Sequence, residues 1–160
     1  MKHEMRRAKQ RLPLEESLAI LQMGSSGVLA LWDGEEPYAV PMSYVYSGGK
    51  LYFHCARAGR KLDAIRVCPR ASFCVVAADD VIPEKYTTAY RSVIVSGPLR
   101  ILEDEAEMVP ALRLLAEKYN PGHSVDAEKE ISAWISHMFM LELCADEISG
   151  KQGKELLKQD

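Results

Sequence analysis

The sequence lacks the short motifs by which several enzyme classes are recognised. Its four cysteines include no Cys-x-x-Cys pair, which argues against a zinc or dithiol redox motif. His3, His123 and His137 have no mutual spacing that builds a metal site, so no metal is expected. No Gly-x-Ser-x-Gly elbow marks a serine hydrolase. The Gly-Ser-Ser-Gly segment 24–27 lacks the ending of a nucleoside triphosphate loop and is interpreted as a turn.

The sequence is also poor in net positive charge and in long apolar runs. The formal net charge of the 160 residues is −3, which argues against a general nucleic-acid binder. The apolar runs are too short to span a bilayer, so no membrane segment is expected. No charged-apolar-small signal sequence opens the chain. We therefore expect a cytoplasmic protein whose cysteines are reduced thiols.

Six short segments have the composition and turn boundaries of β-strands. The predicted strands are 27–32, 38–46, 51–56, 71–78, 90–102 and 137–144. Helices are predicted at 14–23, 60–68, 104–119 and 126–134, with a polar loop over 79–88. Pro41 lies inside the second strand, which indicates an edge, a bulge or a kink that faces a ligand.

Most neighbouring strands in this series are joined as hairpins, and hairpins favour an antiparallel sheet. Six strands without obvious edge protection favour a small closed or half-closed barrel, and there is no regular βαβ alternation. We therefore predict a mainly β domain over residues 12–148 with helices at its margins. A basic arm over residues 1–11 is interpreted as solvated, with packing on a partner subunit as the alternative. Residues 149–160 are expected to form a polar tail.

The stretch 51–66 carries the strongest chemical signal in the chain. A strand breaks at Ala58-Gly59 and restarts as a short helix, with Arg60 and Lys61 where the helix begins. A helix start offers free backbone N–H groups and a positive dipole end, so this junction predicts a site for a phosphate or a carboxylate. The alternative is a pair of solvated surface cations, which are common on proteins.

His54 and Cys55 lie on the strand that leads into this junction. Adjacent strand residues point to opposite faces, so these two side chains are not expected to form a thiolate–imidazole pair. His54 alone is either a half-buried structural histidine or a group that acts beside the anion site.

Several segments together form a pattern that is more specific than any one of them. They are 41–44 (Pro-Met-Ser-Tyr), 51–56 (Leu-Tyr-Phe-His-Cys-Ala), 59–66 (Gly-Arg-Lys-Leu-Asp-Ala-Ile-Arg), 69–70 (Pro-Arg), 90–94 (Tyr-Arg-Ser-Val-Ile) with Gly97, and 148–151 (Ile-Ser-Gly-Lys). In their order and separation, these segments resemble the pyridoxamine 5′-phosphate oxidase-like flavoproteins, and most closely their nitroimidazole-reductase branch. The resemblance covers residues 12–152.

The resemblance implies a six-stranded antiparallel split β-barrel that forms a homodimer and holds FMN in the cleft between subunits. It implies that Arg60 and Lys61 bind the FMN phosphate and that Ser92 contributes from the central strand, across the dimer. It also implies that His54 lies near the substrate as the catalytic residue. The remaining implied flavin contacts are Pro41, Met42, Ser43 and Tyr44, largely through backbone groups, with His54, Cys55 and Ala56 along the ribityl chain and ring edge.

The function that this resemblance implies is an FMN-dependent oxidoreductase. It would pass electrons from NADH or NADPH to a small acceptor such as a nitroaromatic. The arginine-rich C-terminal signature of true pyridoxamine 5′-phosphate oxidases is not evident, so that substrate is not expected. Two alternatives stay open: a non-catalytic protein of this fold that stores or senses flavin or haem, and a dimeric interaction module without a cofactor.

Overall fold

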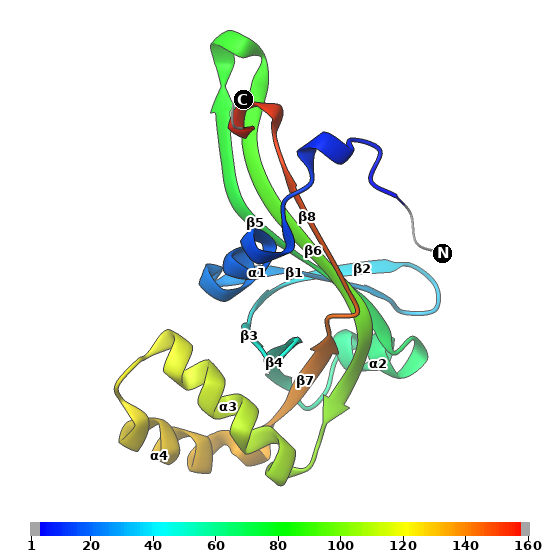
Figure 1. Ribbon diagram of the computed structural model, residues 1–160. Coiled ribbons are helices and arrows are strands. Elements are labelled where there is room, and N and C mark those ends of the chain that lie inside the picture. The colour runs from blue at the N-terminus through cyan, green and yellow to red at the C-terminus, as the bar shows by residue number, and fades with distance from the viewer. Residues whose placement is uncertain (1–3, 158–160) are drawn as a thin grey trace.

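The computed structural model describes residues 4–157 (Figure 1). The strands are β1 (Ser26–Trp32), β2 (Pro37–Ser43), β3 (Val45–Ser47), β4 (Lys50–Ala56), β5 (Arg70–Ile82), β6 (Thr87–Leu102), β7 (Met138–Cys144) and β8 (Glu147–Gln152). The α-helices are α1 (Leu14–Met23), α2 (Arg60–Val67), α3 (Glu105–Tyr119) and α4 (Ser124–Trp134). Short 3₁₀ turns are η1 (Ala8–Gln10), η2 (Pro83–Lys85), η3 (Ile135–His137) and η4 (Lys154–Leu156).

All strand pairs are antiparallel, as predicted, in the order β2-β1-β5-β6-β7-β4-β3, and β8 pairs with β6. The prediction of six strands in a closed or half-closed barrel is wrong in the strand count, because residues 4–157 contain 8 strands in a sheet that is not closed. β6 joins the two halves: its first part pairs with β5 and β8, and Leu99–Leu102 pair with β7. A Cβ at Gly97, where β6 passes between the halves, would overlap the carbonyl oxygen of Cys144.

One extra strand arises because the predicted strand 38–46 is divided at Tyr44. The backbone N–H of Tyr44 donates to the Tyr119 hydroxyl at 2.9 Å, and this hydroxyl donates to the Tyr44 carbonyl at 2.9 Å. Its backbone groups are therefore satisfied by a side chain of α3 rather than by a neighbouring strand. Pro41 lies on β2, opposite Val28, at an edge of the sheet, which confirms the edge interpretation.

The second extra strand is β8, which crosses the expected boundary between domain and tail at residue 148. Ser149 pairs with Ile94 and Gln152 with Arg91, so the first part of the expected tail belongs to the sheet. The end of the basic arm also contacts this strand, since Arg11 forms an isolated antiparallel bridge with Lys151. Residues 1–3 of the arm and 158–160 of the tail lie outside the described residues.

The predicted loop 79–88 is a β-ribbon in the structure. β5 and β6 pair from Asp79 opposite Tyr90 as far as Ile82 opposite Thr87, and only η2 and Tyr86 make the turn. The two strands rise beyond the rest of the sheet, with η4 beside them (Figure 1). Both faces of such a ribbon contact water, so its polar sequence resembles that of a loop.

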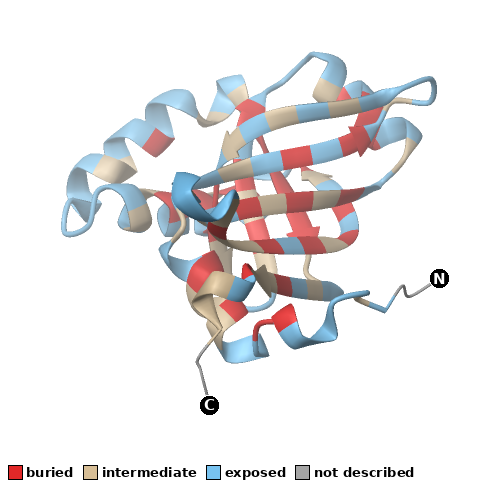
Figure 2. Cartoon of the chain, turned by 90° about the horizontal axis from the view of Figure 1, so that it is seen from above, coloured by how far each residue is buried: buried red, intermediate tan, exposed pale blue. Residues whose placement is uncertain are grey.

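The core lies on the inner side of the curved sheet, and α1, α2 and α3 contribute buried residues to it. Phe73 packs edge-on against both Tyr44 and Phe53, with ring centroids 4.9 Å apart in each pair. Figure 2 shows buried residues alternating with exposed ones along the strands, while α3 and α4 present mostly exposed surface. α3 begins where predicted, because the Asp104 carboxylate accepts the backbone N–H of Ala106 at 2.9 Å. α3 and α4 lie at the end of the molecule opposite the ribbon tip (Figure 1).

Candidate functional site

The junction between β4 and α2 has the form that the sequence predicts. β4 ends at Ala56, Gly59 adopts a φ of 122°, and α2 begins at Arg60. A positive φ of this kind is easily adopted by glycine and explains why the chain turns so sharply here. Lys61 therefore lies in the first turn of α2, at the positive end of the helix dipole.

Arg60 is bound within the chain. Its Nε and Nη2 donate to Asp33 Oδ2 at 3.0 and 2.6 Å, and Nη2 donates to Glu36 Oε1 at 2.5 Å. Its guanidinium also lies over the Tyr38 ring, 4.7 Å from the centroid. Two backbone N–H groups of the β1–β2 turn and then Arg60 lower the pKa of Asp33 to about 2. Arg60 thus ties the start of α2 to this turn, which the sequence did not indicate.

Lys61 differs from Arg60 because it makes no ion pair within residues 4–157. Its side chain is half-buried and lies close enough to Cys55 for its charge to act on that thiol. Burial raises the pKa of Cys55, and the nearby ammonium group of Lys61 offsets only part of that effect. Lys61 is therefore the more available cation at the helix start.

His54 and Cys55 point to opposite faces of β4, as the strand period predicts. Cys55 is buried in the core, whereas His54 is exposed. The cysteine side chain is thus turned away from the surface that carries His54. Only the backbone of Cys55 remains available to a ligand on that surface, while Ala56 shares the exposed face with His54.

His54 and Ser43 meet in a pocket of about 400 Å³ between this face of the sheet and the α3–α4 pair. The wall is predominantly apolar, with a few polar groups, as is usual for small-molecule sites. The other lining residues are Leu112, Leu115, Ala116, Tyr119, Ala127, Glu130, Ile131, Trp134 and Met138. This pocket brings together two of the residues for which a flavin contact was predicted.

Tyr44 does not lie at this surface with its predicted neighbours. The residue is fully buried, and its hydroxyl donates to the Leu21 carbonyl at 2.8 Å. Because its backbone N–H and carbonyl are hydrogen-bonded to Tyr119, neither group is free for a ligand in this structure. Pro41 is exposed and Met42 packs partly against the core, so these two reach the surface only in part.

Ser92 is remote from the pocket within one chain. It pairs with Val76 of β5 and Lys151 of β8, seven residues before Leu99, where β6 begins to pair with β7. At about 3.3 Å per residue, this separation corresponds to roughly 23 Å along the strand. The structure of a single chain therefore does not bring Ser92 together with His54.

The contribution of α3 and α4 to the pocket is the main feature that the sequence analysis missed. The single Tyr119 hydroxyl proton is shared between the Tyr44 and Ser25 carbonyls, and Lys118 Nζ donates to the Gly24 carbonyl at 2.6 Å. The same ammonium group lies 4.1 Å from the centroid of the Tyr44 ring, and burial lowers its pKa. These contacts fix the end of α3 over the sheet. The only available signal was the amphipathic pattern of the helices, which does not identify the surface they cover.

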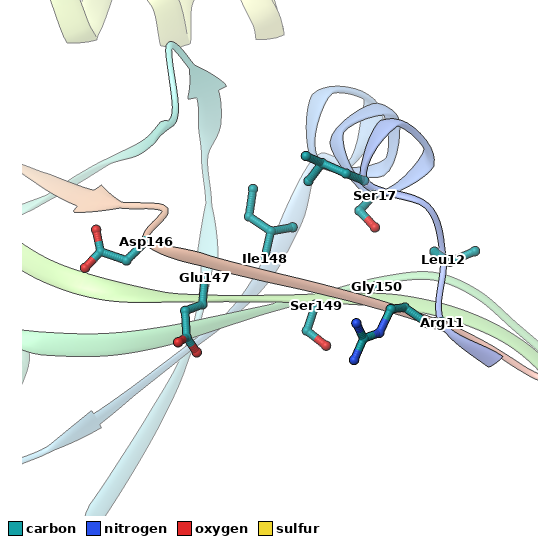
Figure 3. Close-up of a pocket in the computed structure, with 9 residues that line it drawn as sticks. Arg11, Leu12, Ser17, Asp146, Glu147, Ile148, Ser149 and Gly150 are labelled. Carbon is teal, nitrogen blue, oxygen red and sulfur yellow. The ribbon is translucent and has the colours of Figure 1, made fainter. Parts of the chain in front are cut away.

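A second pocket of about 470 Å³ lies between the N-terminal segment and β8 (Figure 3). Arg11, Ser17, Asp146 and Glu147 contribute mixed charges and hydroxyl groups to it, and none of the predicted site residues lines it. Within residues 4–157, no group of three or more His, Cys, Asp or Glu side chains is placed to hold a metal ion. No helix in the same range has both the length and the apolar character needed to cross a bilayer.

Comparisons with known proteins bear on the family and the fold. Residues 13–152 match the model of the family described as pyridoxamine 5′-phosphate oxidase. An uncharacterised protein of Rhizobium meliloti (strain 1021) is 29% identical over 144 residues, which are 86% of this chain and 90% of the relative.

Three solved structures illustrate the likeness of fold. The flavocytochrome Anf3 from Azotobacter vinelandii has a TM-score of 0.80 and 21% identity, covering 99% of this chain and 76% of that one. A FAD- and haem-binding protein from Mycobacterium smegmatis has a TM-score of 0.76 and 22% identity, covering 95% of this chain and 77% of that one. A protein assigned to 5-nitroimidazole antibiotic resistance in Bacteroides thetaiotaomicron has a TM-score of 0.72 and 19% identity, covering 89% of this chain and 86% of that one.

Proposed function

Because the chain belongs to the pyridoxamine 5′-phosphate oxidase family, we propose that it is an FMN-binding oxidoreductase. It would pass electrons from NADH or NADPH to a small nitroaromatic acceptor, as a cytoplasmic member of the nitroimidazole-reductase branch. The observation that carries this proposal is the pocket in which Ser43 of β2 and His54 of β4 meet, because β4 leads directly into the start of α2. Solved structures of this fold that are described as a flavocytochrome and as a FAD- and haem-binding protein support a flavin as the cofactor.

The residues at the junction fit the two chemical parts of FMN. Lys61 and the free backbone N–H groups of α2 suit a phosphate, because a helix start and a cation both favour an anion. The exposed face with Ser43, His54 and Ala56 borders an apolar pocket, which suits a flat ring system. The backbone groups of Met42, Ser43 and Cys55 would give the ring its hydrogen bonds. When bound, the flavin supplies the redox chemistry by accepting and donating two electrons.

His54 is the group we assign to the acceptor. Its imidazole is exposed at the pocket, and histidine exchanges a proton readily near neutral pH. His54 would donate a hydrogen bond or a proton to the acceptor as that molecule is reduced. Tyr119 and the apolar residues of α3 and α4 would hold the acceptor and limit the access of water.

Arg60 has a different role in this proposal from the one that the resemblance implied. In the structure it binds Asp33 and Glu36, so a phosphate would compete with two carboxylates for it. We therefore assign the phosphate mainly to Lys61. Arg60 then contributes positive potential at the helix start and holds the β1–β2 turn against α2.

We propose further that two copies associate through the outer face of β1, β5 and β6. Val28, Cys74 and Ile94 are directly opposite one another across three strands, so their side chains form one row on this face. Val28 is 43% and Ile94 46% exposed, and contiguous exposed apolar side chains of this kind can mark an interaction surface. Ser92, two residues before Ile94, shares this face and would reach the cofactor of the second copy.

The direct test uses the flavin-loaded protein without oxygen. NADH or NADPH is expected to bleach the flavin absorbance, and a nitroaromatic compound is expected to restore it. Flavin that stays oxidised with both donors would contradict the oxidoreductase assignment. The oligomer is tested by light scattering, where Ile94→Glu is expected to convert a dimer into a monomer, and an unchanged mass would exclude this face.

A second candidate is a non-catalytic protein that binds flavin or haem. It is favoured by two structural relatives that are described as a flavocytochrome and as a FAD- and haem-binding protein. His54 would be the natural iron ligand in that case, since imidazole is a common axial ligand. The absorbance spectrum separates haem from flavin, and the reduction experiment separates an enzyme from a storage protein.

A further inference from the structure

The pocket that contains His54 has an uneven charge. Among its lining residues in the described chain, Glu130 is the one carboxylate, and no lysine or arginine contributes. Glu130 lies on α4 and makes no ion pair with any residue that the structure describes. Its neighbours on the helix differ, because Glu128 pairs with Arg113 at 2.6 Å and Lys129 with Asp126 at 3.6 Å.

Two further cations, on α3 and just after β4, are also engaged elsewhere. Lys118 Nζ donates to the Gly24 carbonyl at 2.6 Å and lies over Tyr44. Arg57 Nη1 donates to the Ser136 carbonyl at 2.8 Å, and its guanidinium lies 4.5 Å from the centroid of the Phe139 ring. Neither cation lines the pocket, so neither neutralises Glu130 there.

Trp134 gives the same pocket a planar aromatic wall. Its indole is 55% exposed and packs edge-on against His137, with centroids 5.7 Å apart. Trp134 and Glu130 are one helical turn apart on α4, so they lie on the same side of the helix. An aromatic face and a carboxylate on one wall together favour a flat ring that carries no negative charge.

We propose that Glu130 selects the acceptor by charge, so that the pocket takes planar nitro compounds that are neutral or cationic and rejects anionic ones. This proposal rests on the proposed function in one respect, which is that the molecule bound in the pocket is the electron acceptor. A unit charge a few ångströms from a carboxylate in a partly solvated site changes affinity by about tenfold. Glu130 is therefore a specificity-determining residue, whereas His54 acts on the bound acceptor.

The test compares three compounds that share one ring and differ in charge: 4-nitrobenzylamine, 4-nitrobenzyl alcohol and 4-nitrobenzoate. Dissociation constants are measured by calorimetry on the flavin-loaded protein. We expect the amine to bind about tenfold more tightly than the alcohol, and the benzoate about tenfold more weakly. Glu130→Gln is expected to bring the three constants within about threefold, and Glu130→Lys to reverse their order.

The matched control is Glu84→Gln, which removes the same charge at the ribbon tip, on an exposed turn far from α4 (Figure 1). It is expected to keep the wild-type order of affinities. The proposal would be overturned if the order of the three affinities were unchanged in Glu130→Gln, or if Glu84→Gln abolished that order equally. Equal affinity of the native protein for all three compounds would overturn it as well.

A second measurement separates this inference from the proposed function. Quenching of Trp134 fluorescence by the same compounds reports binding in flavin-free protein, with Trp32→Phe removing the only other tryptophan. If the protein takes up no flavin but still binds the amine more tightly than the alcohol and the alcohol more tightly than the benzoate, the proposed function fails and the inference stands. If flavin binds and is reduced but the three compounds bind with equal affinity, only the inference fails.

Discussion

Lys61→Ala is expected to weaken the binding of FMN far more than that of riboflavin, which lacks the phosphate. Lys61 lies in the first turn of α2, half-buried, and makes no ion pair within the described chain. A hydrogen bond to a charged group contributes about 1.5–3 kcal/mol. At about 1.4 kcal/mol per tenfold change, the dissociation constant of FMN should rise about 10- to 150-fold. That of riboflavin should change by less than about threefold.

Two further variants calibrate this result. Arg66→Ala removes a cation from the last turn of the same helix, where Arg66 pairs with Asp63, and should leave both constants nearly unchanged. Arg60→Ala should weaken FMN binding less than Lys61→Ala does, because Arg60 is held by Asp33 and Glu36. Its effect on folding should also be small, since exposed ion pairs contribute little to stability.

Quenching of flavin fluorescence on titration with protein gives both constants in the same buffer. The ratio of the FMN constant to the riboflavin constant is the informative quantity, because a general loss of structure weakens both ligands together. A ratio that does not change in Lys61→Ala would refute the phosphate assignment. A larger change in Arg60→Ala than in Lys61→Ala would move the assignment to the arginine.

Three other variants test separate parts of the structure. Tyr119→Phe leaves the buried backbone N–H of Tyr44 without its partner, so the free energy of unfolding in urea should fall by about 1–3 kcal/mol. The control Tyr86→Phe, at an exposed turn, should lower the free energy of unfolding by less than about 0.5 kcal/mol. The folded state lowers the pKa of Asp33 from 3.8 to about 2, so the ionised carboxylate stabilises the fold above pH 4 and this stabilisation is lost as the pH falls to 2. Asp33→Asn should therefore flatten the dependence of unfolding free energy on pH between about 4 and about 2. An unchanged slope in that range would contradict the assignment. His54→Ala should retain FMN but lose about a hundredfold or more in turnover with its acceptor, and full turnover would remove His54 from the mechanism.

Local sequence signals predicted the elements that surround the site. Gly59 and the cations after it predicted the turn and the start of α2, and the period of β4 predicted that His54 and Cys55 face opposite sides. Pro41 correctly marked an edge strand. In each case the deciding physics acts within a few residues, so the sequence carries it directly.

The errors arose where distant residues decide the structure. Tyr119 divides the second predicted strand through hydrogen bonds to a residue 75 positions away, and no local pattern announces such a contact. Residues 149–152 of β8 were assigned to the tail because their polar sequence lacks the apolar alternation of a strand, although they pair with β6 and are buried or half-buried except for Ser149. The ribbon at Asp79–Ile82 resembled a loop for the same reason, since strands that are solvated on both faces lose the alternation on which the prediction depends.

The candidate site was predictable in part for similar reasons. The strand, the turn and Lys61 are consecutive in the chain, so their proximity follows from the sequence. The pocket wall is different, because Glu130 and Trp134 reach His54 only through the packing of α3 and α4 on the sheet. The pairing of Arg60 with Asp33 also depends on a tertiary contact between α2 and the β1–β2 turn.

The central claim is that a flavin binds where β4 meets α2, and the absorbance spectrum of the purified protein tests it most directly. The account predicts a yellow protein with flavin bands, at about one flavin per chain after FMN is added and excess is removed. A colourless protein that takes up no FMN, or a spectrum dominated by a haem band, would contradict it.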